Sequence, residues 1–217
     1  MKSISRRRWL VAVPFVLIAA ACGGDDSSSS STPSSGQVTV ETTSTPDSDE
    51  VPQRILSLSP THTEMLFALD AGDQIVAVDS LSNYPEEAEA VRTELSAYEP
   101  NVEAISAYEP DLVVIGDDFT GLADQMALLG IDTWTGATPT SLDDVYAQIE
   151  DLGARIGRVD EAAMTVGLMR SAVETILGQS PGLDLGLTYY HELDNTYYSV
   201  TSNTFIGQLY SLFGLRN

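Results

Sequence analysis

Between Arg54 and Trp134, short apolar segments alternate with segments that carry helical patterns. Strands are predicted over 55–58, 75–78, 112–115 and 131–134, and helices over 85–91, 101–108 and 122–129. A further helix is predicted to start at Thr61, in a capping box that pairs Thr61 with Glu64. The wholly apolar run 112–115 is typical of a strand buried on both faces of a parallel sheet. This alternation predicts an α/β domain with a mostly parallel sheet.

After Ser141 the pattern becomes helical. Helices are predicted over 142–156 and 160–177, followed by a strand over 185–190 and a helix over 205–213. A lone strand has no partner for its backbone N–H and C=O groups, so it must join the first sheet or belong to a second lobe. We favour a second lobe that is incomplete at Asn217. The expected organisation is an N-terminal α/β lobe over 54–158, a connecting helix over 159–178 and the start of a C-terminal lobe over 181–217.

The first fifth of the chain is predicted to direct export rather than to fold. Residues 1–21 combine a cationic start, a short apolar run and small residues, which is typical of a secretion signal, whether Sec or twin-arginine. Cys22 is the only cysteine and follows three alanines, which resembles a lipidation site of bacterial lipoproteins. Residues 22–53 are rich in Ser, Thr and Asp and are expected to form a disordered tether to the membrane. The alternatives are an ordinary signal with an incidental cysteine and a membrane-spanning helix, for which the apolar run is too short.

Charge excludes one class of partner. The chain carries 32 acidic and ten basic residues, a formal net charge of −22, and four of the basic residues lie in the predicted signal. Binding to nucleic acid requires clustered Lys and Arg, so no nucleic-acid partner is expected.

Five segments in order resemble one protein family. They are Arg54 to Leu69, Ile75 to Asp79 with Asn83-Tyr84-Pro85, Asn101 to Ile105 leading to Glu109-Pro110-Asp111-Leu112, the long helix near Asp160, and Ser202 to Gly207 with Gly214 to Asn217. Together they resemble the solute-binding proteins of ABC importers for cobalamin and ferric siderophores. The resemblance implies two Rossmann-like α/β lobes joined by one long helix. It also implies a metal-chelate ligand (ferric siderophore, cobalamin or haem), an ABC permease as partner, a monomer, no enzymatic activity and no cofactor.

Candidate binding residues follow from the rule that open α/β sheets bind ligands beyond the carboxyl ends of their strands. The loops after the predicted strands contain Ser59, Thr61 and His62, then Leu81 and Tyr84, and then Asp117, Asp118 and Phe119; the second lobe offers Tyr190 and Tyr197. Tyrosine suits a large ligand because its body is apolar and its tip is polar. His62 is equally compatible with a helix cap, and the acidic pair Asp117-Asp118 is typical of a solvated loop. Two separated histidines make a poor metal site, so none is predicted.

The resemblance adds two residues and one departure. Family members carry aromatic side chains near the positions of Leu81 and Ala97; this sequence has neither, although Tyr98 lies next to Ala97. Glu103 matches a glutamate that pairs with permease arginines, although a surface helix would also carry such a residue. The resemblance therefore predicts ligand binding by Leu81 and Tyr98 and permease docking by Glu103.

Two other functions remain open from the sequence. A lipid-tethered cell-surface hydrolase would need a serine within reach of His62, but no Gly-x-Ser-x-Gly, Walker A or Gly-x-Gly-x-x-Gly motif is present. A structural or adhesive lipoprotein would be favoured if the fold contained no cleft.

Overall fold

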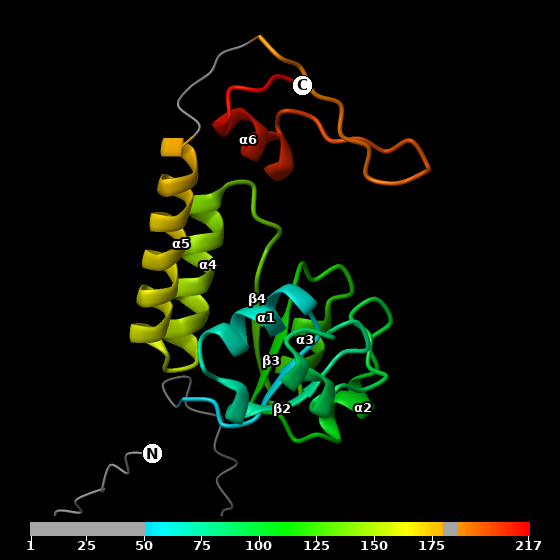
Figure 1. Cartoon of the computed structure of the whole chain (residues 1–217). Helices are drawn as coiled ribbons and strands as arrows, with labels where there is room; N and C mark the ends of the chain where they lie inside the picture. The colour runs from blue at the N-terminus through cyan, green and yellow to red at the C-terminus, as the bar shows by residue number, and fades with distance from the viewer. Residues whose placement is uncertain (1–50, 180–185) are drawn as a thin grey trace, which may run out of the picture. The chain divides into compact units, whose positions relative to one another are not determined.

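The computed structural model describes residues 51–179 and 186–217. Four parallel strands form one sheet in the order β2-β1-β3-β4 (Figure 1). The elements of this part are β1 (Ile55–Ser57), α1 (Pro60–Ala68), η1 (Gly72–Gln74), β2 (Ile75–Val78), η2 (Glu86–Val91), α2 (Val102–Ser106), β3 (Leu112–Ile115), α3 (Leu122–Ala127), β4 (Asp132–Thr135), α4 (Leu142–Arg155) and α5 (Val159–Gln179). The predicted α/β class with a parallel sheet is confirmed.

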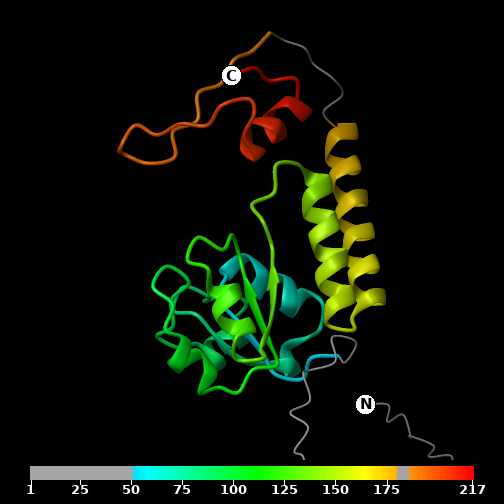
Figure 2. The same cartoon turned by 180° about the vertical axis from the view of Figure 1, so that it is seen from behind.

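Helices cover both faces of the sheet because successive strand residues point to opposite sides. Ile55 and Val114 pack with α1, α4 and α5 on one face, and Leu56 and Val113 pack with α2 and α3 on the other (Figures 1 and 2). All four residues of β3 are buried, as expected of a central strand. This double cover explains why the central strand β3 is apolar at every position instead of alternating with polar residues.

The start of α1 differs from the prediction. The helix begins at Pro60, with Ser59 as its N-cap residue, and no side chain caps it, so the predicted Thr61–Glu64 capping box is wrong. Proline suits the first helical position because its φ is already helical and it has no N–H to satisfy. The Ser59 hydroxyl contacts the His62 ring instead of the backbone. A complete capping box does occur at α4, where Ser141 and Asp144 satisfy each other's backbone N–H groups.

Helices α4 and α5 form an antiparallel hairpin. The turn between them contains Gly157, whose φ of 73° lies in the left-handed region that favours glycine. At the crossing Gly153 is buried, and Ala162 and Val166 of α5 are buried in the same core. The 21 residues of α5 agree with the long helix that the sequence predicts.

Residues 186–217 contain one helix, α6 (Phe205–Leu212), and isolated bridges instead of a ladder. The predicted strand over 185–190 is wrong within the described residues 186–190, where Thr188 makes a single bridge to Arg216. Stacking of Tyr189 on Tyr210, with ring centroids 4.1 Å apart, links this segment to α6. A strand needs a neighbour along its whole length, and none of the described residues after 185 provides one.

The predicted signal, Cys22 and most of the predicted tether lie outside the described residues. The last tether residues, Pro52 and Gln53, contact the lobe: Gln53 N donates to Asp111, and Pro52 O accepts from Gln74 Nε2 at 2.6 Å. Within 51–179 and 186–217, no helix combines the length and the apolar character needed to cross a membrane.

Candidate ligand-binding site

The order of the strands creates a crevice at one edge of the sheet. From β1 the chain moves outward to β2 and then returns across β1 to form β3 on the other side. The loops that leave β1 and β3 therefore diverge, and open α/β sheets bind ligands at such a switch point. A pocket of about 170 Å³ lies here, beyond the carboxyl ends of β1, β2 and β3.

Both apolar and acidic residues line the pocket. Its lining includes the predicted residues Ser59, Leu81 and Tyr98, together with Asp79, Asp117, Asp118 and Phe119. Three of the apolar side chains are largely open to solvent: Phe119 is 86% exposed, Tyr98 77% and Leu81 56%. Exposed large apolar side chains that gather at a concave site are typical of ligand-binding surfaces.

A buried polar network holds the loop after β2. Thr63 Oγ1 lies 2.9 Å from Ser57 Oγ and 3.0 Å from Ser82 Oγ, and Asp79 Oδ1 accepts a hydrogen bond from Ser82 N. All four residues are at most 2% exposed. Because buried polar groups are costly without partners, this network fixes the loop on β1 and α1 and leaves Leu81 at the pocket.

Hydrogen bonds also order the loop after β3. Asp117 accepts from the backbone N–H and the hydroxyl of Thr138, which lowers the pKa of the Asp117 carboxyl. Partial burial acts to raise the pKa of Asp118, but backbone N–H groups of Ala123 and Leu122 donate to it and lower that pKa overall. Asp118 thus serves as a cap for α3. The acidic pair is bound to the fold rather than freely solvated.

His62 lies behind the pocket and does not line it. Its ring is buried, with Nδ1 2.8 Å from Ser59 Oγ and Nε2 3.4 Å from Gln148 Oε1, and it meets the Trp134 ring edge-on at a centroid distance of 5.0 Å. Gln148 donates its amide N–H to the Ala137 carbonyl, so its oxygen faces the ring. This network assigns the proton to Nε2 and leaves Nδ1 to accept from Ser59. His62 therefore positions Ser59 from within the core.

A hydrolase would require a contact such as that between Ser59 and His62, but the partner of the second ring nitrogen of His62 does not match a hydrolytic triad. In hydrolytic triads a carboxylate on that nitrogen stabilises the imidazolium that forms during the reaction. Here the partner is the neutral amide of Gln148, and burial lowers the pKa of His62. Burial outweighs the hydrogen bond with Gln148 and the charge of Asp117, which both act to raise the pKa, so the His62 ring is a weaker base than a free imidazole.

We expect the free energy of unfolding to decrease as the pH falls below about 6.5, the ordinary pKa of an unfolded His. The folded chain holds His62 neutral, whereas the unfolded chain gains a proton in this range, so acid favours unfolding. Urea titrations at several pH values between about 7 and 5, followed by tryptophan fluorescence, measure this effect. His62→Gln is expected to abolish the decline, and His191→Gln to retain it; a decline that persists in His62→Gln would assign it to another group.

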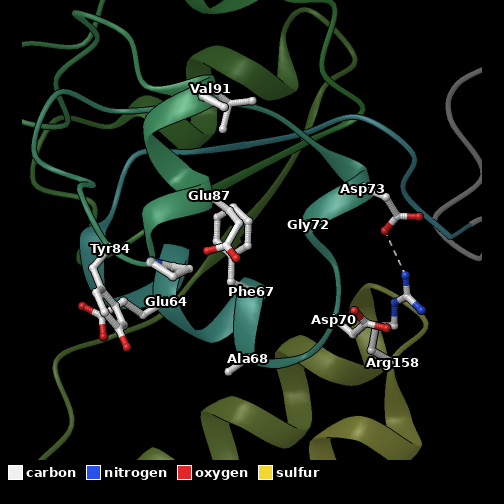
Figure 3. A pocket seen from close by; sticks show the side chains of 12 residues that line it. Glu64, Phe67, Ala68, Asp70, Gly72, Asp73, Tyr84, Glu87, Val91 and Arg158 are labelled. Atoms are coloured by element: carbon white, nitrogen blue, oxygen red, sulfur yellow. Dashed lines mark hydrogen bonds and ion pairs between the residues drawn. The ribbon is translucent and has the colours of Figure 1, made fainter. Parts of the chain in front are cut away.

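A larger groove of about 920 Å³ lies between α1, η1 and η2 (Figure 3). Tyr84, 64% exposed, lies at its rim near Glu64, while an ion pair between Arg158 and Asp73, 3.1 Å long, lies on the opposite side (Figure 3). The groove shares no lining residue with the pocket at the strand ends. Its size alone does not make it the site, because it lies on the outer side of α1 and η2 rather than at a switch point. Tyr84 therefore lines a different hollow from Ser59, Leu81 and Tyr98.

The remaining predicted residues lie elsewhere. Thr61 is exposed on the first turn of α1 but does not line the pocket, and Glu103 is exposed on α2. Tyr190 and Tyr197 are 70% and 85% exposed in the segment after 185. Cys22 lies outside the described residues. Across the described ranges, no group of three or more His, Cys, Asp or Glu side chains is placed to hold a metal ion.

The loop after β3 contributes more of the pocket lining than the sequence pattern indicated. The strand-end rule selects Asp117, Asp118 and Phe119, yet no motif separates a binding loop from a solvated one. The signal that could have ranked them is the contrast within the loop, where a large aromatic residue follows two acids directly after a buried strand. A large apolar side chain that joins others at a concave surface is typical of a binding site.

Comparisons with known proteins agree with this fold. Residues 55–217 match the family described as periplasmic binding protein. The vitamin B12-binding protein of Yersinia pestis (strain Pestoides F) is 33% identical over 126 residues, which make up 57% of this chain and 45% of that relative. The chain thus matches less than half the length of this relative.

Solved structures share the fold at lower identity. A possible iron-binding periplasmic solute-binding protein of Staphylococcus epidermidis aligns with a TM-score of 0.70 at 21% identity, over 77% of this chain and 67% of that one. The periplasmic heme-binding protein of Vibrio cholerae aligns with a TM-score of 0.66 at 20% identity, over 76% of this chain and 65% of that one. The match to the family covers most of the chain, and the chain belongs to the periplasmic binding protein family.

Proposed function

We propose that this protein is the substrate-binding component of an ABC importer and captures a metal chelate, namely cobalamin, a ferric siderophore or haem. The observation that carries the proposal is the pocket at the β1/β3 switch point, where Tyr98 and Phe119 present open aromatic faces. Its support from outside the chain is that relatives are named for binding vitamin B12, iron and heme. The protein binds and delivers its ligand without chemical change.

The ligand would lie between two lobes. In this arrangement the described pocket forms the N-terminal wall, α5 leads towards the second lobe, and Tyr190 and Tyr197 belong to the opposite wall. A large chelate suits such a cleft because planar or rounded ligands gain most from aromatic contact on both sides. The hydrolase and the structural lipoprotein lack a comparable observation: the first needs a carboxylate on His62, and the second needs no pocket.

Titration of the full-length protein, without its signal, tests the proposal. We expect cyanocobalamin, ferrioxamine B or haem to bind saturably in isothermal titration calorimetry. Phe119→Ala and Tyr98→Ala should each weaken that binding by about tenfold, as expected when a central aromatic contact is truncated. Leu128→Ala is the matched control, since Leu128 is 87% exposed and lies outside the pocket. Failure of all three ligands to bind would refute the proposal.

Export and lipid anchoring complete the proposed function. Membership of a periplasmic binding protein family implies export, and Cys22 would carry the lipid that holds the protein at the outer face of the cytoplasmic membrane. Residues 23–50 would then be the tether. Mass spectrometry of the mature N-terminus and detergent partition test this assignment, and a Cys22→Ser variant that remained in the detergent phase would contradict it.

Glu103 is proposed to dock on the ABC permease as part of a monomeric protein. Its carboxylate is exposed on α2, and exposed charges at a docking surface mainly set orientation and association rate. Glu103→Gln should reduce ligand uptake in cells and leave ligand affinity unchanged. An equal loss of affinity would place Glu103 in the binding site instead.

A further inference from the structure

The acidic residues that line the strand-end pocket affect which ligand charges the pocket can accept. Asp117 and Asp118 both line the pocket, and hydrogen bonds from Thr138, Leu122 and Ala123 hold both carboxylates in place. The buried Asp79 adds a third acidic residue to the lining. A carboxylate fixed in this way cannot rotate away from an approaching ligand.

No cation offsets these charges within the described lobe. The only lysine of the chain is Lys2, and no arginine lines the pocket. The arginines of residues 51–179 all have other partners: Arg54 the carbonyls of Tyr108 and Glu109, Arg92 the Glu89 carboxylate and the carbonyl of Ser80 in the loop after β2, Arg155 Asp132, Arg158 Asp73 and Arg170 Asp143.

Apart from the N–H groups of α3, which donate to Asp118, the positive feature of the described pocket is the N-terminus of α1. Ser59 and Pro60 line it, so the free N–H groups of this helix lie nearby. A helix N-terminus carries the equivalent of about half an elementary charge. Two full carboxylate charges outweigh it, and the pocket is negative overall.

We propose that the N-terminal wall of the cleft selects metal chelates without net negative charge and disfavours anionic ones. Tyr98, Leu81 and Phe119 supply apolar contact that is indifferent to charge, while Asp117 and Asp118 repel anionic groups at the same surface. Like charges brought together at an interface cost affinity, so the acidic pair sets specificity and the aromatic side chains supply binding energy. This inference rests on the proposed function and narrows its ligand class to neutral or cationic chelates.

Ligands of one shape and different charge provide the test. Ferrioxamine B is cationic, its N-acetyl derivative is neutral and its N-succinyl derivative is anionic, and all three share one ferric hydroxamate centre. Aquacobalamin, cyanocobalamin and a cobalamin monocarboxylic acid form a second such series. For the full-length protein we expect affinity to fall from the cationic through the neutral to the anionic member of the series that binds. The anionic member should bind at least about tenfold more weakly than the cationic one. At about 1 M salt, where the screening length is about 3 Å, the difference should shrink.

Substitutions of acidic residues test whether the acidic pair causes the difference in affinity between cationic and anionic ligands. The double variant with Asp117→Asn and Asp118→Asn keeps an acceptor oxygen at each position and removes both charges. The cationic and anionic ligands of the series should then bind it with similar affinities. Glu150→Gln removes an exposed carboxylate of α4 outside the pocket and should preserve the difference. Equal affinities across the series, or a preference for the anionic member or for an anionic ferric catecholate, would overturn the inference and leave the binding function intact. Absence of binding by every ligand would overturn both.

Discussion

Gly153→Ala is expected to destabilise the folded chain by about 2 to 3 kcal/mol. A Cβ atom at this position would lie 2.4 Å from the Cβ of Ala162 and 3.0 Å from the carbonyl oxygen of Arg158, whereas carbon atoms pack at about 3.5 to 4.0 Å. Neither neighbour can rotate away, because one is the first atom of a short side chain and the other is backbone. The α4–α5 hairpin would have to open, and its contacts with the sheet would weaken.

Gly167→Ala is the matched control for this prediction. Gly167 lies in the interior of α5, it is exposed, and a Cβ there would meet nothing within 4 Å. Alanine favours the helix over glycine, so this variant should gain about 0.5 to 1 kcal/mol. Urea denaturation measures both changes. Equal effects of the two substitutions would show that helix propensity, and not the close approach of α4 and α5, governs these positions.

Gly136→Ala is expected to cost about 2 kcal/mol of stability and to weaken ligand binding as well. The added Cβ would lie 2.2 Å from His62 Nε2 and 2.7 Å from the Trp134 ring. Both rings are held, since His62 contacts Ser59 and the Trp134 indole N–H donates to Asp151 at 2.7 Å. Displacing the His62 ring would release Ser59 from its place at the pocket.

A double-mutant cycle separates this clash from a general backbone effect. In the His62→Ala background the ring is absent, so Gly136→Ala should cost clearly less than it does in the wild type. Gly116→Ala serves as a control, because a Cβ there would make an ordinary contact of 3.8 Å with Ser59 Oγ. Identical costs of Gly136→Ala in the two backgrounds would rule out the His62 clash as the cause.

Sequence patterns predicted the centre of the sheet well because β1 and β3 are buried on both faces. The run Leu112–Ile115 is apolar at every position, and such a run between helical segments is typical of a central parallel strand. The α5 helix was predictable for a similar reason, since its periodic apolar positions extend over several turns. The prediction failed where one residue decides between two local arrangements: Pro60 moved the start of α1 and left the Thr61–Glu64 box unused.

The candidate site was predictable only in part. The strand-end rule places Ser59, Leu81 and the loop after β3 at one edge once the sheet is parallel. The rule could not say that Tyr84 lies at a different groove, nor that His62 lies behind the pocket. The position of His62 depends on where Trp134 and Gln148 lie, and these residues are 72 and 86 positions away from it in the sequence.

The sequence by itself determined the α/β class, the central buried strand, the long helix and the excess of acid over base, because each depends on local composition and period. Only the tertiary structure decided that Asp117 and Asp118 are held by N–H groups of Thr138 and of α3, and that they share a pocket with Tyr98 and Phe119. The physical reason is that a side chain's charge is fixed by its chemistry, whereas its partners and its exposure are fixed by segments that meet only when the chain has folded.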